Sequence, residues 1–177
     1  MKNVLVLSSS PRENGNSDIL CKQFALGAKE SGHNVEVVRI PNKKIGYCIG
    51  CYACRNTGKC FQKDDMAELT EKVLKADVIV FATPVYFYTM SAQLKTFIDR
   101  LTPIYEEVKA DIYIMCTAWD PEVKNLQLTV ESIRGLTRDC FEDCTEKGVI
   151  VVGDVGSKGE INGRIELQQV YEMGKNC

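Results

Sequence analysis

The chain has one histidine and one tryptophan among 177 residues, and several familiar motifs are missing. The histidine, His33, lies in a Gly-His-Asn stretch that predicts a surface turn. Serine–histidine–acid and cysteine–histidine catalytic sets need a histidine base beside the nucleophile, and no histidine is placed for that role. The phosphate-binding patterns G-x-x-x-x-G-K-[ST] and G-x-G-x-x-G are absent as well. These absences exclude the common hydrolase triads, P-loop proteins and the dinucleotide-binding fingerprint.

Long apolar runs and basic clusters are also missing. The run Val4–Leu7 is too short for the core of a signal peptide. The longest uncharged run, Val78–Leu94, is interrupted by Pro84 and polar residues, so we expect no membrane span. Lysine and arginine number 22 against 24 acids, which gives a net charge of -2 and predicts neither a nucleic-acid nor an anionic-membrane partner. We expect a cytoplasmic protein, in which thiols stay reduced and disulfides are disfavoured.

Short apolar runs alternate with amphipathic stretches along the whole chain, and 45% hydrophobic residues fit one domain of this length. We expect residues 1–177 to form one domain with a cysteine-rich loop inserted at 41–65. Strands are predicted at 3–7, 34–40, 77–83, 111–117 and 148–153, and helices at 17–32, 64–76, 91–101, 122–141 and 161–174. Asp65 with Glu68 predicts a capping box for the second helix. The alternation predicts a three-layer α/β fold with a parallel sheet, in which ligands bind beyond the carboxyl ends of the strands.

The segment after the first predicted strand reads SSSPRENGNS, from Ser8 to Ser17. Hydroxyls, amides and free backbone N–H groups at a helix N-terminus suit a phosphate, and Arg12 can bind one in a bidentate manner. The alternative is that Ser17 caps the helix and the rest is a polar turn. A dinucleotide fold needs an acid at the end of the second strand, whereas Glu36 lies near its start. The pattern therefore favours a mononucleotide.

Aromatic residues follow the third and fourth predicted strands. Pro84 is expected to end the third strand, and Tyr86, Phe87 and Tyr88 come next. Flat side chains at the binding edge suit a planar heterocycle, although some of them could pack under the loop as core. The fourth strand ends in Cys-Thr-Ala-Trp-Asp-Pro, which places Trp119 at the same edge, either beside a ligand or in an oligomer interface.

Nine cysteines are unusual for this length, and four of them, Cys48, Cys51, Cys54 and Cys60, form a C-x2-C-x2-C-x5-C pattern. Three closely spaced cysteines and a fourth further on are typical of iron–sulfur ligation, but the last gap is longer than in ferredoxins and no proline follows. Structural zinc usually takes two separated C-x2-C pairs or adds histidines. An iron–sulfur cluster, free thiols and zinc all stay open. Of the other cysteines, Cys21 and Cys116 are expected to be buried, and Cys140 and Cys144, four residues apart, share a face if that segment is helical.

Taken together, SSSPRENGNS and TPVYFYTMSAQLKTFIDR resemble the phosphate and ring loops of the flavodoxin-like NAD(P)H-dependent FMN reductases. The run CIGCYACRNTGKCFQKDDM is similar to the cysteine loop of the iron–sulfur flavoproteins within that group. The resemblance implies a flavodoxin-like fold, strand order 2-1-3-4-5, and bound FMN. Phosphate contacts are implied for Ser8, Ser10, Arg12, Asn16 and Ser17, ring contacts for Pro84, Val85, Tyr86 and Phe87, a third approach for Thr117, Ala118 and Trp119, and metal ligation for Cys48, Cys51, Cys54 and Cys60.

The leading hypothesis is an FMN-dependent oxidoreductase that takes hydride from NADH or NADPH and passes electrons to a flavin, quinone or other small acceptor. Because no acid–base set is present, we assign no catalytic side chain and expect the cofactor to carry the chemistry. The alternative is an electron carrier that holds FMN and a [4Fe–4S] cluster and accepts electrons from a ferredoxin-like partner. A receiver-like binding module is disfavoured, because the first strand ends in SSSPR rather than in acids. The resemblance also implies a homodimer or homotetramer.

Overall fold

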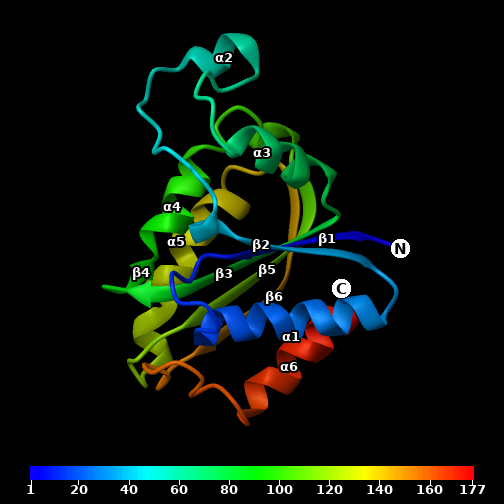
Figure 1. Ribbon diagram of the computed structural model, residues 1–177, viewed down its shortest axis with the longest axis vertical. Helices are drawn as coiled ribbons and strands as arrows, with labels where there is room; N and C mark the ends of the chain where they lie inside the picture. Colours follow the sequence, from blue (N-terminus) through cyan, green and yellow to red (C-terminus); the bar gives the residue numbers. More distant parts are fainter.

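The computed structural model describes residues 1–177 and has a central parallel sheet of five strands (Figure 1). The strands are β1 (Asn3–Ser8), β2 (Asn34–Arg39), β3 (Val78–Tyr86), β5 (Lys109–Thr117) and β6 (Asp143–Val152). Their order is β2-β1-β3-β5-β6, which confirms the predicted order 2-1-3-4-5 and the flavodoxin-like α/β fold. The short strand β4 (Thr89–Met90) adds an antiparallel hairpin to the end of β3.

Helices cover both faces of the sheet (Figure 1). Helices α1 (Asn16–Glu30) and α6 (Ile165–Lys175) pack side by side on one face. Helices α3 (Met66–Lys75), α4 (Ala92–Asp99) and α5 (Gln127–Thr137) lie on the other. A single short helix, α2 (Ala53–Thr57), lies in the cysteine-rich segment, which projects from the body of the molecule. None of these helices is long and apolar enough to cross a membrane.

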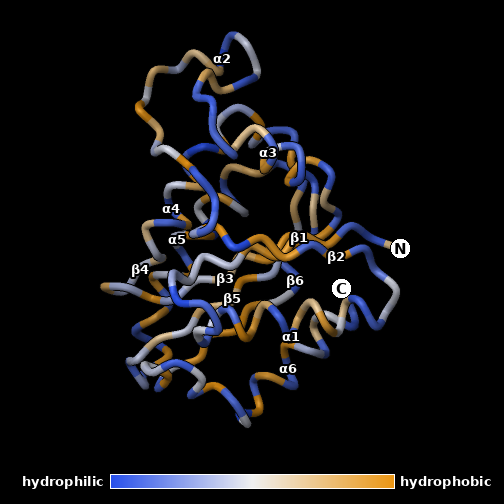
Figure 2. Tube along the Cα trace, viewed as in Figure 1, coloured by the Kyte–Doolittle hydropathy of each residue, from blue (hydrophilic) through white to orange (hydrophobic).

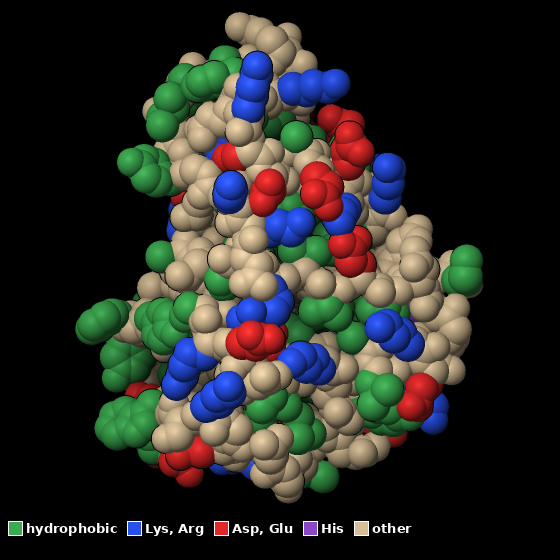
Figure 3. All heavy atoms as spheres, in the orientation of Figure 1, with side chains coloured by type: hydrophobic (Ala, Val, Ile, Leu, Met, Phe, Trp, Pro, Cys, Tyr) green, Lys and Arg blue, Asp and Glu red, His purple; other side chains and the backbone are tan.

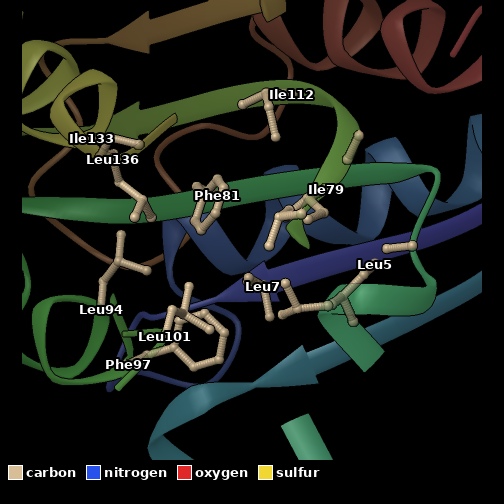
Figure 4. Close-up of a cluster of buried hydrophobic side chains, with 14 of the residues drawn as sticks. Leu5, Leu7, Ile79, Phe81, Leu94, Phe97, Leu101, Ile112, Ile133 and Leu136 are labelled. Carbon is tan, nitrogen blue, oxygen red and sulfur yellow. The ribbon is translucent and has the colours of Figure 1, made fainter. Parts of the chain in front are cut away.

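The sheet is buried on both faces because successive strand residues point in opposite directions. Leu5, Leu7, Ile79 and Phe81 face α3, α4 and α5, and Figure 4 shows them packed against Leu94, Phe97 and Leu101. The alternate residues of β1 and β3, such as Val6 and Val80, face α1 and α6. Figure 2 shows hydrophobic residues concentrated in the central strands, and these are the short apolar runs that predict strands in the sequence.

Two glycines allow α1 and α6 to approach closely. A Cβ atom on Gly174 would lie 2.1 Å from the backbone oxygen of Phe24, and one on Gly27 would lie 2.2 Å from that of Tyr171. No side chain fits at either position, so the two helix backbones are in direct contact there.

Two helix predictions are wrong. The segment 122–141 is not one helix: a 3₁₀ turn at Val123–Leu126 leads into α5, which ends at Thr137, and β6 begins at Asp143. Cys140 and Cys144 therefore lie in different elements and share no helix face. The capping box is also absent, because Asp65 instead accepts the Lys44 N–H and Glu68 pairs with Lys72.

Candidate functional site

The carboxyl ends of β1, β3 and β5 meet at one edge of the sheet. Ser8 lies opposite Ala82 in the β1–β3 register, and Pro84 lies opposite Thr117 in the β3–β5 register. The Ser9 N–H donates to the Ala82 oxygen at 3.0 Å. The structure thus brings together the three segments predicted to surround a ligand, 8–17, 84–87 and 117–119.

The first turn of α1 leaves hydrogen-bond donors without acceptors. Asn14 has φ 54°, and Gly15 has extended backbone as the N-cap, so the chain turns sharply into the helix. The backbone N–H groups of Asn16, Ser17 and Asp18 donate no hydrogen bond, and the buried Ser17 hydroxyl has no partner either. Buried polar groups are normally paired. This cluster of free donors at a positive helix end therefore fits an anion such as a phosphate.

The buried carboxylate of Asp18 stabilises this turn through hydrogen bonds. It accepts the Asn14 N–H and the Ser8 hydroxyl, both at 2.9 Å, and Arg39 Nε lies 3.3 Å from its carboxylate. Burial opposes ionisation, but these hydrogen bonds and the charges of Lys22 and Arg39 hold the pKa of Asp18 below its ordinary value. Arg39 also donates to the Ser10 oxygen at 3.2 Å. Asp18 and Arg39 were not predicted, and they neutralise each other beneath the turn.

The other predicted phosphate ligands already have partners within the chain. Ser10 exchanges hydrogen bonds with the backbone of Arg12, and Arg12 Nη1 donates to the Gly156 oxygen at 3.0 Å. The amide of Asn16 donates to the backbone oxygens of Val155 and Ser157 and accepts from Gly159 and Ile161 N–H. Asn16 therefore fastens the loop after β6 to α1. Of the predicted set, Ser17 and the remaining N–H groups of Arg12 are the most available to a ligand.

The aromatic segment forms the tip of the β3–β4 hairpin. The prediction that Pro84 ends the strand is wrong, because β3 continues through Val85 to Tyr86, which pairs with Thr89. Phe87 and Tyr88 are the two turn residues, with φ of 50° and 62°. Such a turn normally carries asparagine and glycine. Phe87 is 98% exposed, and hydrophobic side chains gather on the same edge of the space-filling view (Figure 3).

The third segment combines buried backbone with an exposed ring. Thr117 and Ala118 are buried, and Ala118 continues the pairing with β6 through its N–H, which donates to the Val152 oxygen. Trp119 is 80% exposed and packs beside Gly156. Trp119 also borders a polar cavity of about 590 Å³ whose other lining residues include Asp154, Glu160 and Arg164.

Hydroxyl groups that sequence reasoning missed join the first two segments. The Ser91 hydroxyl donates to the Ser9 hydroxyl at 2.9 Å and accepts the Leu94 N–H as the N-cap of α4. Thr83 accepts the Ser91 N–H at 2.9 Å. All three hydroxyls are buried. The signal was a serine directly before an amphipathic helical stretch, which is typical of an N-cap.

The four cysteines of the C-x2-C-x2-C-x5-C pattern line a second cavity, of about 470 Å³, at the projecting loop. Ile98, Leu101 and Leu136 also line it, and so does a fifth thiol, Cys140. All nine cysteines are free, and no three cysteine, histidine or acidic side chains are arranged to hold a metal ion. Cys21 and Cys116 are buried as predicted, and burial raises the pKa of each thiol to about 12.

Comparison with known proteins agrees with this geometry. An iron–sulfur flavoprotein of Archaeoglobus fulgidus is 45% identical over 103 residues, which are 58% of this chain and 46% of the relative. An iron–sulfur flavoprotein of Methanocaldococcus jannaschii is 39% identical over 101 residues, 57% of this chain and 52% of the relative. The chain thus matches about half the length of these relatives.

Solved structures share the fold at low sequence identity. The NAD(P)H:quinone oxidoreductase from Methanothermobacter marburgensis superposes with a TM-score of 0.74 at 21% identity, over 99% of this chain and 95% of its own. An azoreductase from Bacillus anthracis superposes with a TM-score of 0.77 at 16% identity, over 100% of both chains. The sequence model of the NADPH-dependent FMN reductases matches residues 2–118, which include the segments 8–17 and 84–87 and the four cysteines. Because this match covers more than half of the chain, the protein belongs to the NADPH-dependent FMN reductase family.

Proposed function

We propose that the protein is an FMN-dependent oxidoreductase that transfers electrons from NADH or NADPH to a small acceptor such as a quinone or a flavin. The observation that carries this proposal is the set of unpaired donors at the first turn of α1, next to the hairpin 84–90 on the same edge of the sheet. Family membership supports FMN as the cofactor and a nicotinamide as the electron donor.

The residues present fit a flavin mononucleotide. The phosphate would take the free N–H groups of Asn16 to Asp18, the Ser17 hydroxyl and Arg12. The ring system would lie against Val85, Tyr86 and Phe87, with Trp119 at the same edge of the sheet. When bound, FMN accepts two electrons as a hydride and releases them to an acceptor.

The chain itself would bind the cofactor, orient it and shield it from water, and we assign no side chain as proton donor. The pKa of Asp18 is held low by the partners described above, and its carboxylate is buried beneath the turn. The exposed hairpin tip and Trp119 would guide a planar donor or acceptor onto the open face of the ring. The nicotinamide would supply two electrons and one proton as a hydride, and a quinone-type acceptor would need one further proton, from solvent.

Titration of the purified chain with FMN and with riboflavin tests this proposal, with flavin fluorescence as the readout. We expect saturable binding of FMN and at least tenfold weaker binding of riboflavin, because about 1.5–3 kcal/mol comes from each charge-assisted hydrogen bond to the phosphate. FMN-loaded protein should then oxidise NADH or NADPH when a quinone is present. If FMN shows no saturable uptake, or if riboflavin binds equally well, the assignment is wrong.

The cysteine loop supports a second candidate function, an iron–sulfur flavoprotein that passes single electrons from a ferredoxin-like partner to FMN. Four thiols line one cavity, and relatives at 45% and 39% identity are named iron–sulfur flavoproteins. The donor set suits an iron–sulfur cluster, whose ligands are cysteine thiolates. Gly50, Tyr52 and Gly58 have positive φ, so the loop already turns sharply three times and could contract around a ligand.

Iron, sulfide and FMN content per chain from an anaerobic preparation separates the two candidates. About four iron and four sulfide per chain, lost in a Cys51→Ser variant, is expected for a [4Fe–4S] carrier. Iron-free protein that oxidises NADPH rapidly supports the simple reductase and eliminates the carrier.

A further inference from the structure

Arg100 is a buried cation that the proposed function does not use. It is the C-cap residue of α4, and its side chain is 1% exposed. A guanidinium is buried at this depth only when its charge and its N–H groups are satisfied. The partners of Arg100 therefore indicate what the residue does.

Those partners belong to the two chain segments at the base of the cysteine loop, residues 44–47 and 62–65, which we call the neck. Arg100 Nη1 donates to the Gly46 oxygen at 2.6 Å and to Gln62 Oε1 at 3.1 Å. Both terminal nitrogens bind the carboxylate of Asp64, at 2.6 and 3.0 Å. One side chain thus holds the segment that enters the loop and the segment that leaves it.

Asp64 completes this arrangement from the other side. Besides Arg100, it accepts the N–H groups of Gly46 at 2.9 Å and Met66 at 3.1 Å. Burial opposes its ionisation, but Arg100 and these backbone groups hold the pKa of Asp64 below its ordinary value. Burial likewise opposes the charge of Arg100, yet Asp64, with a smaller contribution from Cys60, raises its pKa. Both side chains of this pair are charged, and both are largely removed from water.

One donor of Arg100 has no partner, because its Nε–H is buried without an acceptor. The two terminal nitrogens make all the hydrogen bonds of this side chain, and all of them go to the neck.

Helix α4 connects this neck to the flavin edge. Ser91 caps its first turn and bonds to Ser9 beside the proposed phosphate site, while Arg100 caps its last turn and bonds to the neck. Eight residues separate the two caps, so a single rigid helix separates the two sites.

We propose that Arg100 is a positioning residue for the cysteine loop: it holds the neck closed through Gly46, Gln62 and Asp64.

Hydrogen exchange of the metal-free protein tests this proposal. Arg100→Gln removes the charge and the forked donors, and Arg100→Lys keeps the charge but cannot bind both segments. Amides of residues 44–64 should exchange at least about tenfold faster in Arg100→Gln, with partial rescue in Arg100→Lys and unchanged exchange in β1 and β3.

Asp64→Asn removes the same ion pair from the loop side and should also accelerate exchange, so the conclusion does not depend on the correct folding of a single variant. Lys95→Gln, which removes an exposed cation from the same helix, is the matched control and should exchange like wild type. Unchanged exchange in Arg100→Gln would overturn the positioning role.

Discussion

The hydroxyl of Ser91 lies 2.9 Å from the hydroxyl of Ser9 and donates a hydrogen bond to it, although 82 residues separate them in the chain. Ser9 in turn donates to the Ala82 oxygen at 2.9 Å. This buried chain of bonds joins the segment that would hold a phosphate to the helix that follows the aromatic hairpin. The two halves of the proposed flavin site are therefore coupled through hydroxyl groups and not only through the sheet.

Ser91→Ala should lower both stability and FMN affinity. It removes the N-cap of α4 and the bond to Ser9, which together contribute about 1–2 kcal/mol. Urea unfolding of the apoprotein measures the loss of stability, and FMN titration measures the effect on the site. Ser132→Ala is a suitable control, because the Ser132 hydroxyl bonds only to the Thr129 oxygen within its own helix. Equal effects of the two substitutions would show that the link between Ser9 and Ser91 has no special role.

Ser17→Ala should change stability and binding in opposite directions. Its buried hydroxyl has no partner in the protein, so its removal should leave the apoprotein unchanged or more stable by about 0.5–1 kcal/mol. FMN binding should weaken about tenfold, because the hydroxyl is available to a phosphate oxygen. Thermal melting of the apoprotein and FMN titration measure the two effects. A variant that is destabilised and binds FMN normally would show that Ser17 has a structural role only.

The strand order and the edge that carries the site could be predicted from sequence. Runs such as Val4–Leu7 and Val78–Phe81 are apolar at every position. A continuous apolar run is typical of a parallel strand whose two faces are both buried. The first half of β6 could not be predicted, because Asp143–Lys147 is polar and lies at the end of a strand on the sheet margin. Its pairing with β5 depends on backbone hydrogen bonds, which leave no pattern in the side chains.

The buried charges were missed for a different reason. Asp18 shares a helix face with Cys21 and Ala25, and Arg100 follows Phe97 by three residues, so each charge interrupts an apolar stripe. That interruption is visible in the sequence. The partners are not, because Arg39 and Asp64 lie 21 and 36 residues away along the chain.

Gly174→Ala should destabilise the protein even though alanine is the better helix former. The new methyl group would meet the backbone oxygen of Phe24 at 2.1 Å, and neither helix backbone can move aside without disturbing the core. We expect a loss of about 1–3 kcal/mol, larger than the gain of about 1 kcal/mol from helix propensity. Gly135→Ala in α5 is the matched control, because nothing lies within 4 Å of its added methyl group. It should stabilise by about 0.4–1 kcal/mol. Denaturant unfolding measures the stability of both variants. Equal changes in the free energy of unfolding would contradict the described contact between α1 and α6.

Asp18→Asn should have an effect that depends on pH. Because the folded state holds the pKa of Asp18 below its unfolded value, the stabilisation is complete at neutral pH and is lost as pH falls through the folded pKa. The difference in unfolding free energy between wild type and Asp18→Asn should therefore be constant from pH 7 to pH 5 and should shrink below about pH 4. Glu13→Gln, in the same loop and without a partner, should change stability by less than about 0.5 kcal/mol. A difference for Asp18→Asn that stayed constant down to pH 2 would mean that the asparagine acts through packing alone.

A double substitution at the hairpin tip, Phe87→Asn with Tyr88→Gly, should stabilise the protein and impair its proposed activity. Both positions have positive φ, which costs bulky aromatic residues about 1 kcal/mol each and suits asparagine and glycine. Thermal melting should therefore rise in the double variant. Turnover of NADPH by the FMN-loaded variant should fall, because the exposed rings that would guide planar substrates are gone. Strain retained at an exposed tip motivates the hypothesis that the side chains there have a function. A double variant that is more stable and equally active would show that Phe87 and Tyr88 are not part of the site.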